Sequence, residues 1–164
     1  ARKYIGTPYR RGSKGPNRFD CSGFTQYIFN HFSYSLNASS ASQYLQGISV
    51  KDEEICRGDL VFFKGRNSRR SNVGHVGLVT EVYPDGRFKF IHASTSQGIR
   101  EDWNFSPYYA QRYVGARRIY FVQIDKRLIL DAILELEDID DNTPFTEMEK
   151  SITPQEFSTF VRAE

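Results

Sequence analysis

The stretch Asp-Cys-Ser-Gly-Phe at residues 20–24 constrains the fold of this chain more than any other. The glycines and prolines that precede it disfavour regular structure, whereas apolar residues after it recur at helical spacing. These apolar residues are Phe24, Tyr27, Ile28 and Phe32. Asp20 is a good N-cap, so the pattern predicts a helix from Cys21 to about Phe32 with the thiol in its first turn.

The position of Cys21 admits two interpretations. Unpaired N–H groups and the helix dipole favour an anion at a helix start, and they lower cysteine pKa values from about 8.5 toward roughly 3.5–7.5. Cys21 is then a reactive nucleophile, and Gly23 lets another backbone or a substrate approach closely. In the alternative, Cys21 is a small buried residue behind the Asp20 cap. The stretch alone leaves both interpretations open.

The histidines favour the first interpretation, because a cysteine nucleophile needs a base and often a third group that orients it. Of the three histidines, His31 is expected about 15 Å along the same helix, too far from Cys21 to act as the base. His75 opens one strand-like run and His92 closes the next, with a hairpin turn at Pro84-Asp85-Gly86 between them. In this register His75 pairs near residue 94 and the two imidazoles share one face.

Further short motifs follow one another along the chain. They are Gly6-Thr7-Pro8-Tyr9, residues 20–24, Ser42-x-Tyr44, Gly58-Asp59-Leu60-Val61-Phe62-Phe63, Gly74-His75-Val76-Gly77 and Ile91-His92-Ala93. In order and spacing, over roughly residues 1–120, these motifs resemble the NlpC/P60 family of cell-wall cysteine peptidases.

The resemblance implies an α+β, papain-like fold in which the helix that carries the nucleophile packs on a central antiparallel sheet. Residues 1–120 are expected to form the catalytic domain, and residues 121–164 an acidic helical extension packed on it. The resemblance also implies that Cys21 is the nucleophile, His75 the base and His92 its orienting partner.

Three further residues acquire roles by the same resemblance. Tyr9 is expected to line the site and to help stabilise the oxyanion, whereas Asp20 and Ser22 flank the nucleophile and contact the substrate. The implied reaction is hydrolysis of an amide bond in bacterial cell-wall peptides, between D-γ-glutamate and a diamino acid, through a thioester and without a cofactor. The expected partners are peptidoglycan stem peptides or muropeptides, and the expected location is the cell envelope, in the periplasm or at the cell surface.

The residue chemistry by itself supports only thiol-dependent acyl transfer. An amidase or transacylase with the same thiol chemistry, and a catalytically silent wall-binding module, therefore remain as alternatives. Asp102 and Asn104 compete with His92 as the orienting residue, but the hairpin delivers His92, which we therefore favour. Cys21 with the two histidines is a conceivable zinc site, yet no cluster offers metal-ligand spacing, so we expect no metal.

Composition limits the remaining possibilities. The chain has 164 residues, enough for one ordinary domain, and no run approaches the roughly 20 apolar residues that span a membrane. No stretch has the pattern of a signal peptide. Two cysteines do not make a disulfide framework, so Cys56 is expected to be a half-buried loop or strand residue.

Charge is divided unevenly along the chain. Residues 1–120 carry 18 Lys and Arg against 9 Asp and Glu, whereas residues 121–164 carry 4 against 11. The loop at residues 64–70 is strongly basic, but it lacks interleaved aromatics and no nucleic-acid motif accompanies it. We therefore expect no nucleic-acid binding. Helical periodicity after residue 128 and a capping box at residues 153–156 predict two helices in the acidic extension.

Overall fold

The computed structural model describes residues 1–65 and 72–120. Residues Ala1–Tyr120 form one compact unit. The helices expected for the acidic extension, and most of the basic loop at residues 64–70, lie outside the described residues. No helix within the described ranges has the length and apolar character needed to cross a bilayer.

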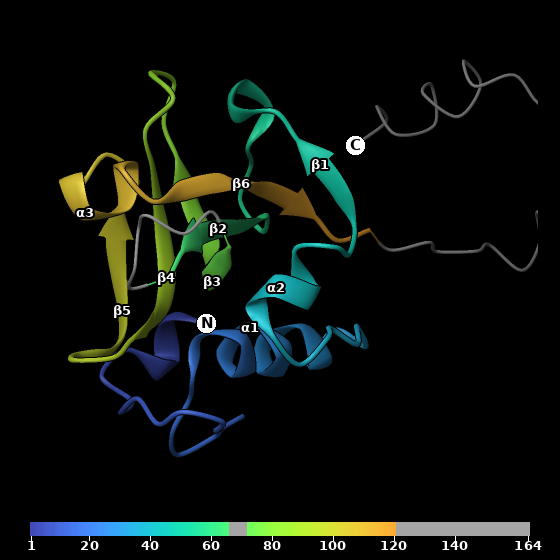
Figure 1. Cartoon of the computed structure of the whole chain (residues 1–164), viewed down its shortest axis with the longest axis vertical. Helices are drawn as coiled ribbons and strands as arrows, with labels where there is room; N and C mark the ends of the chain where they lie inside the picture. Colours follow the sequence, from blue (N-terminus) through green and yellow to red (C-terminus); the bar gives the residue numbers. More distant parts are fainter. Residues whose placement is uncertain (66–71, 121–164) are drawn as a thin grey trace, which may run out of the picture. The chain divides into compact units, whose positions relative to one another are not determined.

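The described residues form short helical segments and strands. In chain order they are a 3-10 turn at Arg2–Tyr4, α1 at Cys21–Asn30, α2 at Ser40–Gln43, β1 at Ile48–Val50, a 3-10 turn at Asp52–Glu54, β2 at Leu60–Lys64, β3 at Val73–Val82, β4 at Phe88–Ser94, β5 at Gly98–Trp103, α3 at Pro107–Ala110 and β6 at Tyr113–Arg118. The strands form a six-stranded sheet in the order β1-β6-β2-β3-β4-β5 (Figure 1), and each described neighbouring pair is antiparallel. The predicted α+β fold with an antiparallel sheet is confirmed.

Helix α1 begins where its sequence predicts. The Asp20 Oδ1 accepts a hydrogen bond from the Gly23 N–H at 2.6 Å, so the N-cap is confirmed. Its other oxygen, Oδ2, accepts from the Gly12 N–H at 2.8 Å and thereby holds the preceding loop against the helix start. The helix ends at Asn30, two residues before the predicted Phe32. Asp20 therefore fixes both the loop and the first turn, in which Cys21 lies.

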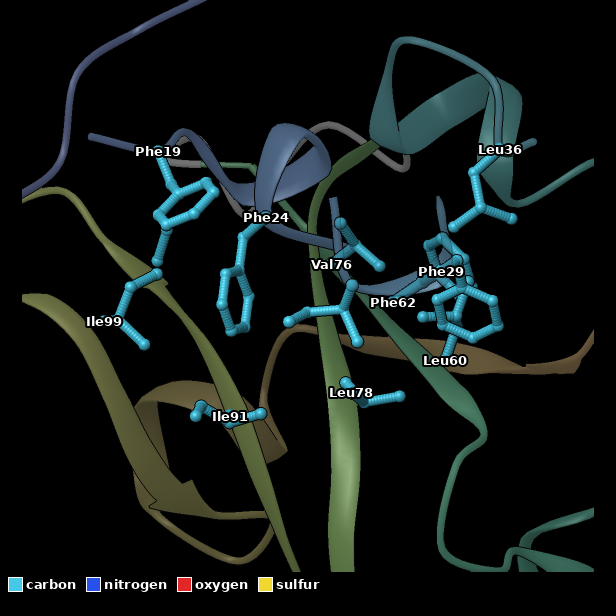
Figure 2. Close-up of a cluster of buried hydrophobic side chains, with 12 residues drawn as sticks. Phe19, Phe24, Phe29, Leu36, Leu60, Phe62, Val76, Leu78, Ile91 and Ile99 are labelled. Carbon is cyan, nitrogen blue, oxygen red and sulfur yellow. The ribbon is translucent and has the colours of Figure 1, made fainter. Parts of the chain in front are cut away.

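Helix α1 packs on one face of the sheet through an apolar cluster. Phe24, Ile28 and Phe29 point from the helix toward strand residues such as Phe62 and Ile91, and Figure 2 shows Phe24 and Phe29 among the strand side chains. Phe24 and Phe62 are fully buried. Each such side chain contributes roughly 1.5–3 kcal/mol through the hydrophobic effect. This cluster fixes the height of α1 over β3 and β4.

Strand β2 is apolar throughout because both faces of the sheet are covered at its position. Leu60 and Phe62 belong to the cluster under α1, whereas Val61 and Phe63 belong to a second cluster on the opposite face. All four side chains are buried. A strand buried on both faces has a continuous apolar sequence instead of an alternating one, which accounts for this run.

The hairpin of β3 and β4 forms in the predicted register. Leu78 pairs with Ile91 and Val79 with Phe90, and a bulge at the next position shifts the pairing by one residue toward the turn. Continued toward the open end of the hairpin, this register sets His75 opposite residue 94. The two histidines thus share the face of the sheet that carries Phe90, as the hairpin pattern predicts.

The environment of Cys56 differs from the prediction. The residue is exposed, in the loop before β2, and not half-buried. Neither of the two cysteines of the chain, both of which lie within the described residues, forms a disulfide. Cys21 is therefore a free thiol, as a nucleophile requires.

Candidate active site

A cavity of about 830 Å³ opens at one end of the sheet. Its described lining includes residues of the loop before α1, the first turn of α1, the end of β2, the start of β3, the end of β4, the turn before β5, β5 itself and helix α3. Cys21, His75 and His92 all line it. The structure thus brings the three predicted triad residues to one cavity, although they come from three different elements.

The sulfur of Cys21 lies directly beside the start of β3. The backbone N–H groups of Cys21, Ser22 and Val76 hydrogen bond to it and favour the thiolate, but burial and the negative charge of Asp20 outweigh them. The net effect raises the pKa of the Cys21 thiol above its ordinary value. The predicted lowering by the helix start is therefore wrong, because the donors of the first turn do not compensate for lost hydration.

His75 and His92 contact each other through their rings. Nε2 of His75 lies 2.9 Å from Nδ1 of His92, within hydrogen-bond distance. Burial, and then the neighbouring His92, lower the pKa of His75 to about 3, whereas the charge of Asp102 acts in the opposite direction. In the free protein at neutral pH, His75 is therefore an uncharged imidazole, and it lines the same cavity as the uncharged Cys21 thiol.

Glycine at position 77 makes room for this ring pair. A Cβ on Gly77 would lie 2.6 Å from a ring carbon of Phe90 and 3.3 Å from the Cβ of His92. The first distance is far below a normal contact, so any side chain would displace the neighbouring rings. Gly77 therefore allows His92 and Phe90 to occupy the face of the sheet next to His75.

Asp102 and Tyr109 close the far side of His92. The Asp102 Oδ2 lies 2.9 Å from Nε2 of His92, and the Tyr109 hydroxyl lies 3.1 Å from the same nitrogen. His92 is fully buried, and the guanidinium of Arg100 forms an ion pair with Oδ1 of Asp102. Both ring nitrogens of His92 are thus occupied.

The charge on Asp102 is retained in this setting. Burial raises the pKa of the carboxyl, but the hydrogen bond from His92 and the charge of Arg100 lower it further, so the net pKa lies below its ordinary value. Asp102 is consequently a carboxylate at neutral pH, and it can only accept hydrogen bonds.

Asp102 and Asn104, which the sequence offered as alternatives to His92, have different surroundings. Asp102 contacts His92 instead of replacing it next to His75. Asn104 is used locally, because its Oδ1 accepts a hydrogen bond from the Phe88 N–H at 2.9 Å. Asn104 is also absent from the described lining of the cavity.

Most of the charged residues in the described cavity wall are cationic. This wall carries the four basic side chains Arg11, Lys64, Arg100 and Arg112. Asp102 is the only carboxylate among the described lining residues, and it is already paired. The guanidinium of Arg112 lies over the Tyr108 ring at 3.8 Å and donates to the Tyr108 carbonyl, so its position is fixed. An anionic ligand is favoured in such a cavity.

Comparison with known proteins is decisive for the family. The model of the NlpC/P60 family matches residues 6–118. This chain belongs to the NlpC/P60 family. A probable endopeptidase of Haemophilus influenzae is 36% identical over 118 residues, which cover 71% of this chain and 69% of that protein. The gamma-DL-glutamyl hydrolase of Bacillus subtilis is 33% identical over 128 residues, 77% of this chain and 29% of that protein.

Solved structures of the NlpC/P60 family have the same fold. A family member from Bacillus cereus aligns with a TM-score of 0.64 at 30% identity, over 71% of this chain and 37% of that one. The matched region is small in some relatives: it covers 14% of a probable endopeptidase p60 from Listeria grayi, at 44% identity over 78 residues. The common part is thus one domain of proteins that are often longer.

The three flanking residues of the NlpC/P60 motifs occupy different positions. Tyr9 lines the cavity with Cys21. Asp20 uses its carboxylate for the helix cap and the Gly12 loop, and the hydroxyl of the buried Ser22 donates to the Ala38 carbonyl at 2.9 Å. Neither Asp20 nor Ser22 is among the described residues that line the cavity. Their contact with substrate stays a prediction.

Two residues at the cavity had no individual role in the sequence analysis. Tyr109 belongs to an aromatic-rich stretch that fits either the core or a groove wall, and it serves both, since it packs edge-on against Phe90 and lines the cavity. Arg100 lies on β5, a strand that the sequence pattern did not predict. The sequence of this strand contains a glycine and three charged residues, so it offered no local signal of a strand.

Proposed function

We propose that this protein is a cysteine peptidase that hydrolyses an amide bond in bacterial cell-wall peptides, with Cys21, His75 and His92 as the catalytic residues. The observation that carries the proposal is the convergence of three groups on one cavity: a free thiol, an uncharged imidazole, and a second imidazole 2.9 Å from the first. Membership of the NlpC/P60 family supports the proposal, because the motifs that contain these three residues resemble the motifs of that family.

The reaction starts from a neutral pair. His75 removes the proton from the Cys21 thiol as the sulfur attacks the carbonyl carbon of the substrate. The negative charge then passes to the carbonyl oxygen, and the imidazolium of His75 is stabilised by His92. A raised thiol pKa and a lowered imidazole pKa mean that the ion pair forms during attack and is not stored in the free protein.

The oxyanion is stabilised by hydrogen-bond donors near the start of α1. We assign it to the backbone N–H of Cys21 together with the hydroxyl of Tyr9, which lines the same cavity. His75 next donates its proton to the leaving amine, which leaves an acyl group on the sulfur as a thioester. Water, deprotonated by His75, hydrolyses this thioester and restores the free thiol. No step needs a cofactor.

The substrate is expected to be an acidic peptide. A D-γ-glutamyl residue is linked through its side chain and so keeps a free α-carboxylate, which suits a wall that carries Arg11, Lys64 and Arg112. The relative in Bacillus subtilis is named for hydrolysis of a gamma-DL-glutamyl bond. We therefore infer that the scissile bond joins D-γ-glutamate to a diamino acid in a stem peptide or muropeptide, and that the protein acts in the cell envelope.

The test is product analysis by mass spectrometry after incubation with purified muropeptides of defined sequence. The wild type is expected to release fragments cut after D-glutamate, and Cys21→Ala to release none. Cys56→Ala is the matched control, because it removes the other thiol, and it should cut like the wild type. Cleavage at an amide outside the stem peptide, or transfer of the acyl group to an added amine, would support the amidase or transacylase alternative. Tight binding without any product from the wild type would support a silent wall-binding module.

A further inference from the structure

The polar contacts of His92 restrict where its protons lie. Its Nε2 lies 2.9 Å from a carboxylate oxygen of Asp102, and its Nδ1 lies 2.9 Å from Nε2 of His75. Asp102 is ionised at neutral pH, because His92 and Arg100 hold its pKa below the ordinary value. A carboxylate has no proton to give, and two acceptors do not face each other at this distance without repulsion. Nε2 of His92 must therefore carry a proton and donate it to Asp102.

The same argument passes from His92 to His75. A neutral His92 that is protonated at Nε2 has a bare Nδ1, which can only accept. Nε2 of His75 must then carry the proton that fills this contact. The remaining nitrogen of His75 is Nδ1, and in a neutral ring it is bare. This is the form of the imidazole that can receive a proton from a thiol.

The hydroxyl of Tyr109 fits this arrangement. It lies 3.1 Å from Nε2 of His92 and also hydrogen bonds to Asp102. A hydroxyl both donates and accepts, so Tyr109 can donate to the carboxylate and accept from Nε2–H at once. The alternative, in which Tyr109 donates to a bare Nε2, would place that lone pair against the Asp102 oxygen. The Tyr109 contact therefore supports the same protonation of His92.

We propose that Asp102 is a positioning residue that sets the tautomers of His92 and, through it, of His75, so that His75 presents a bare Nδ1 to Cys21. The proposal rests on the assignment of His75 as the base in the proposed function. Asp102 touches neither the sulfur nor, on this assignment, the scissile bond. Asp102 acts through the two imidazole rings. It thereby determines whether Nδ1 of His75 can accept the proton of the Cys21 thiol.

Arg100 makes the isosteric Asp102→Asn variant informative. Arg100 donates to Oδ1 of Asp102 while His92 faces Oδ2. An asparagine has one oxygen and one NH2 group, and the NH2 group cannot face the guanidinium because both are donors. The oxygen should therefore stay with Arg100, and the NH2 group should face His92. Nε2 of His92 would then be bare, Nδ1 protonated, and His75 reversed so that Nδ1 carries its proton toward Cys21.

The first experiment reads the tautomers directly. The chain has three histidines, so 15N NMR of the histidine-labelled full chain gives few ring signals, and His31→Gln identifies those of His31. At pH 8 the wild type is expected to show protonated Nε2 and bare Nδ1 for both His75 and His92. In Asp102→Asn the pattern should be reversed for both rings. Unchanged tautomers in Asp102→Asn would overturn the proposal.

The second experiment measures kcat and KM on a muropeptide. Asp102→Asn is expected to lower kcat by about 10²- to 10⁴-fold. The lower value is typical of losing a residue that hydrogen bonds to a functional histidine, and the higher value is typical of a histidine held in the wrong tautomer. KM should change little, since both oxygens of Asp102 are already engaged with Arg100 and His92. Glu101→Gln is the matched control, because it removes a neighbouring carboxylate of the same strand, and it should retain wild-type kcat. An Asp102→Asn enzyme with wild-type kcat, or one whose loss lies in KM alone, would contradict the proposal.

Removal of Arg100 separates the proposed role from a purely structural one. In Arg100→Ala/Asp102→Asn the asparagine is free to turn its oxygen toward His92, so the wild-type tautomers and at least a tenfold part of kcat should return. Arg100→Ala alone should lose far less kcat than Asp102→Asn. An equal loss in these two single variants would mean that Asp102 acts only by restraining Arg100. The tautomer measurement needs no substrate, so it tests the proposal even if the wild type cleaves no wall peptide, which would instead refute the proposed function.

Discussion

Two groups of residues in this protein each contain a cysteine, an aspartate and an arginine. They differ in the residues that lie between the cysteine and the aspartate. In the loop before β2, the Cys56 N–H donates directly to Asp59 at 2.8 Å, and Arg118 holds both oxygens of that aspartate at 2.7 and 2.9 Å. Asp59 is 1% exposed. The result is a compact ion pair that ties this loop to β6.

At the cavity, two histidines separate the cysteine from the aspartate. The line runs from Cys21 through His75 and His92 to Asp102, with Arg100 at its end. Imidazole both donates and accepts, so this line can carry a proton, whereas the direct contacts at Asp59 leave none to move.

The comparison shows that thiol acidity does not distinguish the two cysteines. Burial and the charge of Asp20 raise the pKa of Cys21, and partial burial and the charge of Asp59 raise the pKa of Cys56. What Cys21 has and Cys56 lacks, among the described residues, is an imidazole at the same cavity. In the proposed function, Cys21 is therefore activated by a neighbouring base and not by its own ionisation.

The largest expected effect is inactivation by iodoacetamide. Alkylation of the wild type should abolish hydrolysis, and Cys56→Ser should lose activity at the same rate. Because the pKa of Cys21 is raised, the inactivation rate should rise about tenfold per pH unit between pH 6 and 8, in proportion to the thiolate fraction. A rate that stays constant over this range would show a preformed thiolate–imidazolium pair, and it would contradict the conclusion that both cysteines have raised pKa values. Residual activity after each pH incubation gives the rate.

The second prediction concerns the stability that the ion pair of Asp59 and Arg118 gives to the fold. Asp59→Asn should lower the free energy of unfolding by about 2–4 kcal/mol, less than the roughly 3–5 of a fully buried pair, since water can partly replace the lost partner of Arg118. Arg118 is 31% exposed. Urea denaturation at pH 7.5 measures this loss, and Glu53→Gln, in the exposed turn nearby, should unfold like the wild type. Folded Asp59→Asn should keep the wild-type kcat, whereas a stable but slow enzyme would erase the distinction between the two aspartates.

The smallest effect is a slope of stability against pH. The pKa of His75 is about 3 in the folded protein, below the ordinary value near 6.5, so the unfolded chain binds more protons between these values. The histidine therefore makes the fold less stable as pH falls from about 6.5 toward 3, by at most about 1.4 kcal/mol per pH unit. Urea midpoints between pH 6.5 and 5 should fall less steeply in His75→Gln than in the wild type. Equal slopes would mean that His75 is not held neutral.

The parts of the fold that the sequence predicted are those where local chemistry agrees with tertiary packing. The Asp20 cap and the hairpin between His75 and His92 depend on residues close together in the chain, and both formed as expected. The hairpin pattern also placed the two imidazoles on one face, which is confirmed by their contact.

The parts that were missed depend on distant partners. Strand β5, Gly98–Trp103, contains a glycine and three charged residues, and such a sequence has little preference for a strand. It becomes one because it pairs with β4 along six residues. Asp102 could therefore be recognised as a candidate, but its contact with the far side of His92 could not be predicted before β5 was known.

The thiol pKa shows the same limit. A helix start favours an anion, and that local effect is present in the N–H groups around the sulfur, but burial is set by the whole fold and prevails. The position of Cys21 in the sequence predicted that the helix start lowers the thiol pKa, but it could not predict that the net shift is upward.

The peptide unit between His75 and Val76 has a consequence for how the site can fail. Val76 donates its main-chain N–H to the Cys21 sulfur, and His75, the proposed base, lines the cavity together with that sulfur. A displacement of the helix by the width of a hydrogen bond would therefore remove the base and the donor in the same movement. The contact between α1 and β3 should therefore be lost as a unit, and a partial separation of the two elements should abolish activity well before the domain unfolds.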